Sequence, residues 1–251
     1  MTKPCYSCPK GLMDGYVTIY LDKFCRWQCF QNYGGCPSSF DREVIKFRSV
    51  IKAIKGALEQ NPKARIFLDA PNFLDVPERR VLPGNDDNQH IQLLNKIIKQ
   101  KIQPCLRIET TVRSLLKTRA DFYDFLFKAG IREIWMGVES ASLKLRKKYG
   151  KPHFENSQLV EITKALGRTG ILCGWYLVVG FEDSEESIQA TIDLIQEARP
   201  HRIFLLQLLP YGFGEQMISL GALATRIPDI IGYQARLQKI AQELDEKLCK
   251  T

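Results

Sequence analysis

The chain has 251 residues, of which 45% are hydrophobic and 25% charged, and its net charge is +8. These values are typical of a soluble globular protein and exclude a disordered or collagen-like chain. The longest nearly unbroken apolar run, residues 170–181, is too short for a membrane span, which needs about 20 residues. The first twenty residues contain no apolar signal segment, so we expect a cytoplasmic protein with no membrane partner.

Strand and helix patterns alternate along the chain. Short runs rich in β-branched, aromatic and other apolar residues predict six strands, at 16–21, 64–68, 105–109, 133–138, 171–179 and 203–209. Apolar residues three and four apart predict helices at 41–59, 88–101, 119–128, 155–166, 183–198 and 230–250, with a short helical piece at 142–149. One face of the first helix should carry Val44, Phe47, Val50, Ile51, Ile54 and Leu58.

Six strand-then-helix units in succession predict a parallel sheet with crossover helices. The strands are nearly continuous apolar runs, as expected for strands that are buried on both faces. The chain has no room for eight units, so we expect an α/β fold, a partial (β/α)6 TIM-like barrel with parallel strands. Residues 1–15, with Cys5 and Cys8, should form an N-terminal extension, and residues 16–251 the barrel domain.

In parallel barrels the chemistry collects in the loops that follow the strands. One edge should therefore gather the cysteine-rich loop after the first strand, residues 69–72 and 109–113, Glu139 with Ser140, and residues 180–183 and 210–212.

Five of the eight cysteines lie within the first 36 residues, which favours metal binding over disulfides in a cytosolic chain. Cys25, Cys29 and Cys36 follow the first strand as C-x3-C-x6-C. Three thiolates can hold three irons of a [4Fe–4S] cluster and leave the fourth iron without a protein ligand. Cys5 and Cys8 combined with Cys25 and Cys29 approach a four-thiolate zinc pattern instead. Spacing alone leaves both interpretations open.

The other strand ends carry further motifs. They lie in the segments 64–79 (ARIFLDAPNFLDVPER), 129–151 (AGIREIWMGVESASLKLRKKYGK), 170–191 (GILCGWYLVVGFEDSEESIQAT) and 203–215, which contains Leu-Pro-Tyr-Gly. In this order and spacing the chain resembles the core domain of the radical S-adenosylmethionine (SAM) superfamily. It is most similar to the group around the cobalamin-dependent and methylthiotransferase-like members.

This resemblance implies an enzyme that uses a [4Fe–4S] cluster to cleave SAM reductively and generate a 5′-deoxyadenosyl radical. The implied cofactors are the cluster and SAM, and the implied partner is a reducing electron donor such as flavodoxin or ferredoxin. The substrate, whether a small molecule, a peptide or a nucleic acid, is not specified, and the resemblance does not identify the catalytic residues.

The resemblance also implies a set of site residues. Cys25, Cys29 and Cys36 would be the metal ligands, Asp69 and Ala70 would lie beside the SAM amino group, Glu139 and Ser140 would face its ribose or methionine part, and Val178, Gly180 and Leu208 would flank the adenine.

The cysteine loop departs from the family spacing. The family pattern C-x3-C-x2-C would place the third thiol at Asn32, whereas the next cysteine is Cys36. A loop longer by four residues makes Cys36 the third ligand. The alternative is a non-catalytic zinc- or iron–sulfur-binding module on a degenerate barrel of this family. A nucleic-acid-modifying enzyme is suggested by the net charge of +8 alone.

The choice of Cys36 is testable. We expect the Cys36→Ala protein, reconstituted with iron and sulfide without oxygen, to lose most of its cluster, because two thiolates do not hold the cluster. Iron and acid-labile sulfide per chain are the measurement. A variant that keeps a full cluster and cleaves SAM would remove Cys36 from the ligand set.

Overall fold

A computed structural model describes residues 15–22, 44–74, 88–118, 120–151, 153–179, 184–207 and 230–250. Six parallel strands form one sheet in chain order: β1 (Tyr16–Tyr20), β2 (Arg65–Asp69), β3 (Cys105–Thr111), β4 (Ile131–Glu139), β5 (Leu172–Val179) and β6 (Arg202–Gln207). Within these described strands β1 and β6 do not pair with each other, so the sheet stays open. The predicted partial barrel is confirmed.

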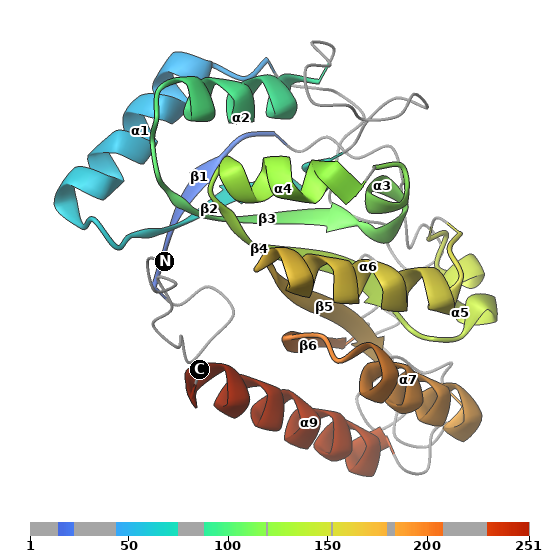
Figure 1. The fold of residues 1–251 in the computed structure, drawn as a ribbon. Coiled ribbons are helices and arrows are strands. Elements are labelled where there is room, and N and C mark those ends of the chain that lie inside the picture. Colours follow the sequence, from blue (N-terminus) through green and yellow to red (C-terminus); the bar gives the residue numbers. More distant parts are fainter. Residues whose placement is uncertain are drawn as a thin grey trace, which may run out of the picture.

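Helices cover the outer, convex side of the curved sheet (Figure 1). They are α1 (Phe47–Gln60), α2 (Gln89–Lys99), α3 (Val112–Leu116), α4 (Ala120–Lys128), α5 (Leu143–Lys148), α6 (Asn156–Thr169), α7 (Glu185–Ala198) and α9 (Ile230–Lys250). A membrane-crossing helix, which has to be both long and apolar, is not found among the described residues.

Local capping explains where several helices begin. Asn88 accepts hydrogen bonds from the backbone N–H groups of His90 and Ile91, which starts α2. Ser184 forms a capping box with Ser187 at the start of α7, at the N-terminus that the sequence predicts. Thr111 accepts a hydrogen bond from Ser114 N–H and starts the short helix α3, which the sequence pattern did not predict because five residues are too few for a periodicity.

The prediction for the first helix is wrong at its start. The described helix α1 begins at Phe47, so Val44 does not share its apolar face and is 81% exposed. Val50, Ile51 and Ile54 are buried as predicted.

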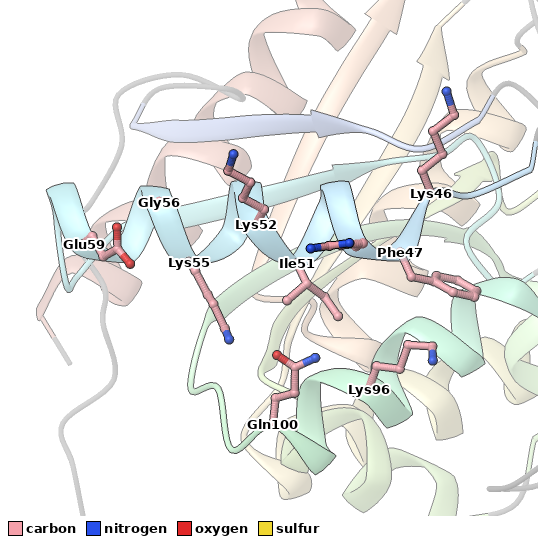
Figure 2. A pocket seen from close by; sticks show the side chains of 10 residues that line it. Lys46, Phe47, Ile51, Lys52, Lys55, Gly56, Glu59, Lys96 and Gln100 are labelled. Carbon is pink, nitrogen blue, oxygen red and sulfur yellow. The ribbon is translucent and has the colours of Figure 1, made fainter.

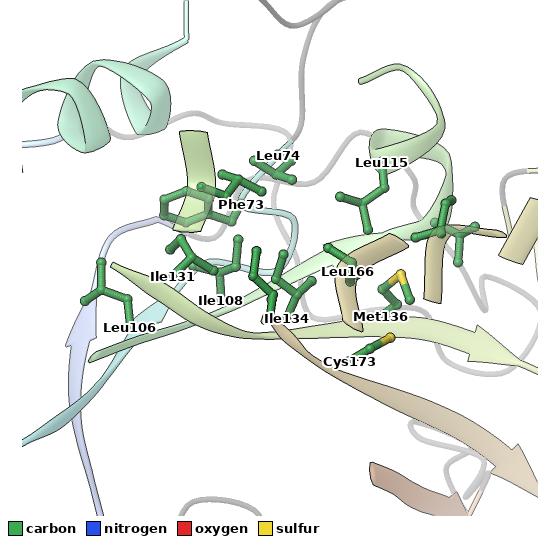
Figure 3. Packing of buried hydrophobic residues seen from close by; sticks show 14 of the residues in the cluster. Phe73, Leu74, Leu106, Ile108, Leu115, Ile131, Ile134, Met136, Leu166 and Cys173 are labelled. Atoms are coloured by element: carbon green, nitrogen blue, oxygen red, sulfur yellow. The ribbon is translucent and has the colours of Figure 1, made fainter. Parts of the chain in front are cut away.

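An apolar core fills the space between the sheet and the helices (Figure 3). Alternate strand residues, such as Ile66, Leu68, Ile108 and Ile134, point into this core and are fully buried. The residues between them point to the opposite, inner face, as the two-residue period of a strand requires. That inner face is also covered, but by charged and aromatic side chains rather than by the apolar side chains that continuous apolar strands predict.

Gly174 of β5 is required by close packing on the inner face. A Cβ atom added there would lie 2.4, 2.5 and 2.7 Å from three atoms of the Trp135 indole. Trp135 is itself only 2% exposed, so its ring has little room to move. The absence of a side chain at Gly174 is therefore what allows the indole to lie flat against β5.

We expect Gly174→Ala to destabilise the protein by about 1–3 kcal/mol, the usual cost of overpacking a core. Gly56→Ala is the control, because a Cβ at Gly56 in α1 meets nothing within 4 Å. Replacing a mid-helix glycine by alanine should stabilise by about 0.5–1 kcal/mol. Urea unfolding followed by circular dichroism measures both, and equal stabilities for the two variants would contradict the packing argument.

Candidate functional site

The amino-end half of the inner face is organised around Glu133. Its carboxylate accepts hydrogen bonds from Arg65 Nη2 at 2.9 Å, from Trp135 Nε1 at 2.6 Å and from the Tyr16 hydroxyl. Arg202 Nη1 lies 3.9 Å from the same carboxylate. Burial and the negative charge of Glu133 raise the pKa of Tyr16 well above its usual value, so the phenol remains a donor. These interactions close the amino end of the barrel interior.

A second charged group lies further along the inner face. Arg107 of β3 is completely buried, and its Nη2 donates to Glu109 Oε1 at 3.0 Å and to the Tyr176 hydroxyl at 2.8 Å. The Tyr176 hydroxyl in turn donates to Glu109. The guanidinium also lies over the rings of Phe67 and Trp135, at 4.9 and 5.0 Å from their centroids. Arg107 therefore fixes the position of both Glu109 and Tyr176.

Two carboxylates beside Arg107 have perturbed ionisation. Burial raises the pKa of Glu109, against the lowering effects of the hydrogen bond from Tyr176 and the charge of Arg107. Burial also raises the pKa of Asp69, the last residue of β2, and Arg107 again opposes the shift. Asp69 and Glu109 are half-buried, so solvent reaches part of each side chain.

The carboxyl end of β4 carries a buried ion pair. The register of the β4–β5 pairing shifts between Gly137 and Glu139, and Glu139 adopts a left-handed backbone with φ of 67°. Its carboxylate folds back over Gly137, where Oε1 lies 2.7 Å from the position of an added Cβ. Lys151 Nζ lies 2.5 Å from Glu139 Oε1. Non-glycine residues with this backbone are concentrated at functional sites, because other contacts must hold them there.

The turn after Glu139 supplies those contacts. The backbone N–H of Ala141 donates to Thr191 Oγ1 at 3.0 Å, and Arg146 Nη1 donates to the carbonyl of Ser140 at 2.7 Å. Glu139 is 3% exposed, and its Oε2 atom has no hydrogen-bond partner among the described residues. A buried carboxylate oxygen without a donor is costly, so a donor from a ligand or from outside the described residues would stabilise it.

The structure brings most of the described site candidates to the inner face or the carboxyl edge. Asp69 ends β2, the fully buried Ala70 follows it, and Glu139 ends β4. Val178 is buried in β5, two residues after Tyr176 and hence on the same face. The Ser140 hydroxyl accepts a bond from Ser142 N–H at 3.1 Å, so its described contacts shape the turn. Gly180, Leu208, the metal candidates Cys25, Cys29 and Cys36, and the extension cysteines Cys5 and Cys8 lie outside the described residues.

The sequence interpretation did not include three side chains that the structure brings to the candidate site: Arg107, Tyr176 and Lys151. A signal for the first was present, because Arg107 lies between Leu106 and Ile108 in a buried strand and shares a face with Glu109. A charge at such a position has to face the barrel interior. The pairing of Lys151 with Glu139 carries no comparable sequence signal, because a turn and a helix separate the two residues.

No family model matches the chain, and no curated protein is similar to it. Solved structures do match. TsrM, a radical SAM methyltransferase from Kitasatospora setae with cobalamin and a [4Fe–4S] cluster bound, is 16% identical over 77% of this chain and 36% of its own, with a TM-score of 0.57. OxsB, a cobalamin-dependent radical SAM enzyme, is 14% identical over 93% of this chain and 31% of its own, with a TM-score of 0.58.

HemN, the radical SAM coproporphyrinogen III oxidase of Escherichia coli, is 16% identical over 92% of this chain and 52% of its own, with a TM-score of 0.56. The described chain therefore has the fold of the radical SAM core domain, as the sequence resemblance predicts. It spans about a third of the length of TsrM and OxsB and about half that of HemN.

The hydrogen bond between Tyr176 and Glu109 gives a direct test of this inner face. In Tyr176→Phe the ionised carboxylate loses a donor, so the pKa of Glu109 should rise further. Side-chain carboxyl ¹³C chemical shifts followed during a pH titration measure the change. Tyr123→Phe, in α4 on the helical side, is the control and should leave the Glu109 pKa unchanged.

The sign of the stability effect follows from that shift. A carboxyl whose folded pKa is raised favours folding below its unfolded pKa, about 4.3, and loses this contribution as the pH rises through the folded pKa. The unfolded pKa is the same for both proteins and cancels in the comparison. The free energy of unfolding of Tyr176→Phe, relative to that of the unsubstituted protein, should therefore decrease only as the pH rises through the raised folded pKa of Glu109. A difference that does not depend on pH would contradict the assignment.

Proposed function

We propose that the protein is a radical SAM enzyme. The observation that carries the proposal is the buried Glu139 Oε2 atom, which lacks a partner among the described residues and lies at the carboxyl edge of a barrel of the radical SAM type. The strand at the start of this barrel leads directly into the C-x3-C-x6-C loop.

The polar groups at the carboxyl edge fit SAM. SAM carries a cationic sulfonium, an ammonium, a carboxylate and two ribose hydroxyls. Glu139 Oε2 can accept a bond from a hydroxyl or an ammonium, and the Asp69 carboxylate offers a second anionic acceptor. The ammonium of Lys151, already held by Glu139, offers a cation to the SAM carboxylate. Val178 offers an apolar surface for the adenine.

Cys25, Cys29 and Cys36 would hold the cluster in this proposal. When bound, the cluster and SAM together supply a 5′-deoxyadenosyl radical for hydrogen abstraction from a substrate. Arg107 keeps Glu109 and Tyr176 in place at the half-buried inner face, where a substrate would meet them. A cytoplasmic setting belongs to the proposal, because the thiolates have to remain reduced.

Metal content is the first experiment. Protein purified and reconstituted without oxygen should contain about four irons and four sulfides per chain with little zinc. With SAM and dithionite it should release 5′-deoxyadenosine, which is measured by chromatography. Stoichiometric zinc with negligible sulfide would overturn the proposal and favour the non-catalytic zinc module.

The site is tested in the same experiment with Glu139→Gln. Loss of the buried carboxylate should raise the Kd of SAM about tenfold, because a hydrogen bond to a charged group contributes about 1.5–3 kcal/mol. Glu161→Gln, at an exposed position of α6, is the control and should bind SAM normally. Unchanged SAM binding in Glu139→Gln would exclude this residue from the site.

A further inference from the structure

A basic groove runs between the helices α1 and α2, on the side of the sheet that the helices cover (Figure 2). It has a volume of about 820 Å³. Its charged lining consists of Lys46, Arg48, Lys52, Lys55 and Lys96, with Glu59 the one acidic residue among the described residues of the lining. All five cations are exposed, and none forms an ion pair within the described part of the chain. We call this feature the α1–α2 groove.

The charges of α1 oppose its own stability. Lys46 and Arg48 lie at the amino end of the helix, where the helix dipole favours anions, and the first turn contains no acidic residue. Arg48 and Lys52 are four residues apart, so these like charges repel each other on one face by about 0.2–0.5 kcal/mol. Glu59, the acidic lining residue, lies at the carboxyl end, where the dipole favours cations. Folding alone gives no reason for this arrangement, but an anionic partner does.

Gly56 adds an independent observation. It lies in the interior of α1 and lines the groove, although an alanine side chain there would meet no atom within 4 Å. A glycine at such a position lowers helix stability by about 0.5–1 kcal/mol. The glycine leaves room on the groove surface, because a partner can approach the helix backbone closely at a residue that has no side chain.

The groove lies next to both ends of the cysteine loop. Asp22, three residues before Cys25, pairs with His90 Nε2 of α2 at 3.3 Å. Ile45, at the far end of the loop, donates its backbone N–H to Gln89 Oε1 of α2 at 2.7 Å. Three residues of chain reach at most about 11 Å, so a cluster held by Cys25, as in the proposed function, would have to lie within about that distance of Asp22 plus the length of the cysteine side chain. The amino end of the groove, at Lys46, follows Ile45 directly.

We propose that the α1–α2 groove is the docking site for an acidic one-electron carrier protein that reduces the cluster. This inference rests on the proposed function. The carrier's reduced flavin or iron–sulfur centre gives up one electron and is oxidised. The cluster accepts that electron and is reduced. No proton or group is transferred.

The lining favours a protein over a nucleic acid. Single-stranded nucleic acids bind basic grooves that also present aromatic rings for base stacking. Phe47 is the one aromatic residue among the described residues of the lining, and it is half-buried, with Lys96 Nζ 5.4 Å from its ring centroid. Cations around a small apolar floor, formed here by Phe47 and Ile51, are typical of a protein interface with a charged rim.

The test compares two triple charge reversals. The groove variant is Arg48→Glu, Lys52→Glu and Lys55→Glu, and the control is Lys164→Glu, Arg168→Glu and Lys239→Glu. The control changes the net charge equally, at exposed positions on α6 and α9. A glutamate at position 48, near the start of α1, suits the helix dipole, and all three positions are exposed, so the groove variant should fold, which circular dichroism verifies.

Binding to the reconstituted protein is measured with oxidised flavodoxin and, separately, with ferredoxin. We expect the groove variant to raise the Kd of the carrier at least tenfold at low salt, and the control variant to change it less than twofold. The rate of cluster reduction by the reduced carrier should fall at least tenfold in the groove variant only. Reduction by dithionite, a small molecule that needs no docking site, should be unchanged.

Each other outcome has a defined meaning. Equal carrier binding by the two variants, or no binding of either carrier to the unsubstituted protein, overturns the docking proposal. So does a groove variant that loses affinity for a twenty-nucleotide RNA and not for the carriers, which would assign the groove to nucleic acid. Because dithionite-driven 5′-deoxyadenosine formation does not depend on the groove, it tests the proposed function separately. A protein that holds no cluster would form no 5′-deoxyadenosine in that assay, whether or not it binds the carriers.

Discussion

The burial of the Arg107 guanidinium is the constraint on which the inner face of the barrel depends. A fully buried cation without partners would cost several kcal/mol, so the surrounding strands have to supply them. Glu109 comes from the same strand and Tyr176 from β5, while the rings of Phe67 and Trp135 cover the guanidinium. Gly174 in turn leaves the space that Trp135 occupies. One buried charge thus links four of the six strands and fixes the groups that face the barrel opening.

The carboxyl edge depends on a different constraint, the left-handed backbone of Glu139. Gly137 provides the space into which the carboxylate folds, and Lys151 binds one of its two oxygens. The other oxygen has no partner among the described residues and is the atom that we propose contacts SAM. In the proposed activity, the substrate would meet the inner face, SAM would bind at the carboxyl edge, and the electron donor would dock at the α1–α2 groove.

Much of the fold was predicted from local patterns in the sequence. All six strands were predicted near their observed positions, because buried parallel strands are continuous apolar runs, and Ser184 marked the start of α7 because its capping box is local in sequence. The helix α3 was not predicted, because its five residues are too few for a periodicity, and the first helix was predicted to begin at residue 41 rather than at Phe47. Asp69 and Glu139 were expected at the carboxyl edge from their position after strands, and the structure places both there. Their contacts with SAM were implied by the family resemblance and stay a prediction.

The sequence by itself determined the order of strands and helices, the parallel sheet and the edge at which the polar residues gather, because each of these follows from neighbours within a few turns of chain. Only the tertiary structure decided that Lys151 pairs with Glu139, that Arg107 is completely buried with Tyr176, and that five cations of α1 and α2 line one groove. Those relations join residues from separate elements. Their energies arise from desolvation and charge in a folded interior or surface, which no local pattern of residues encodes.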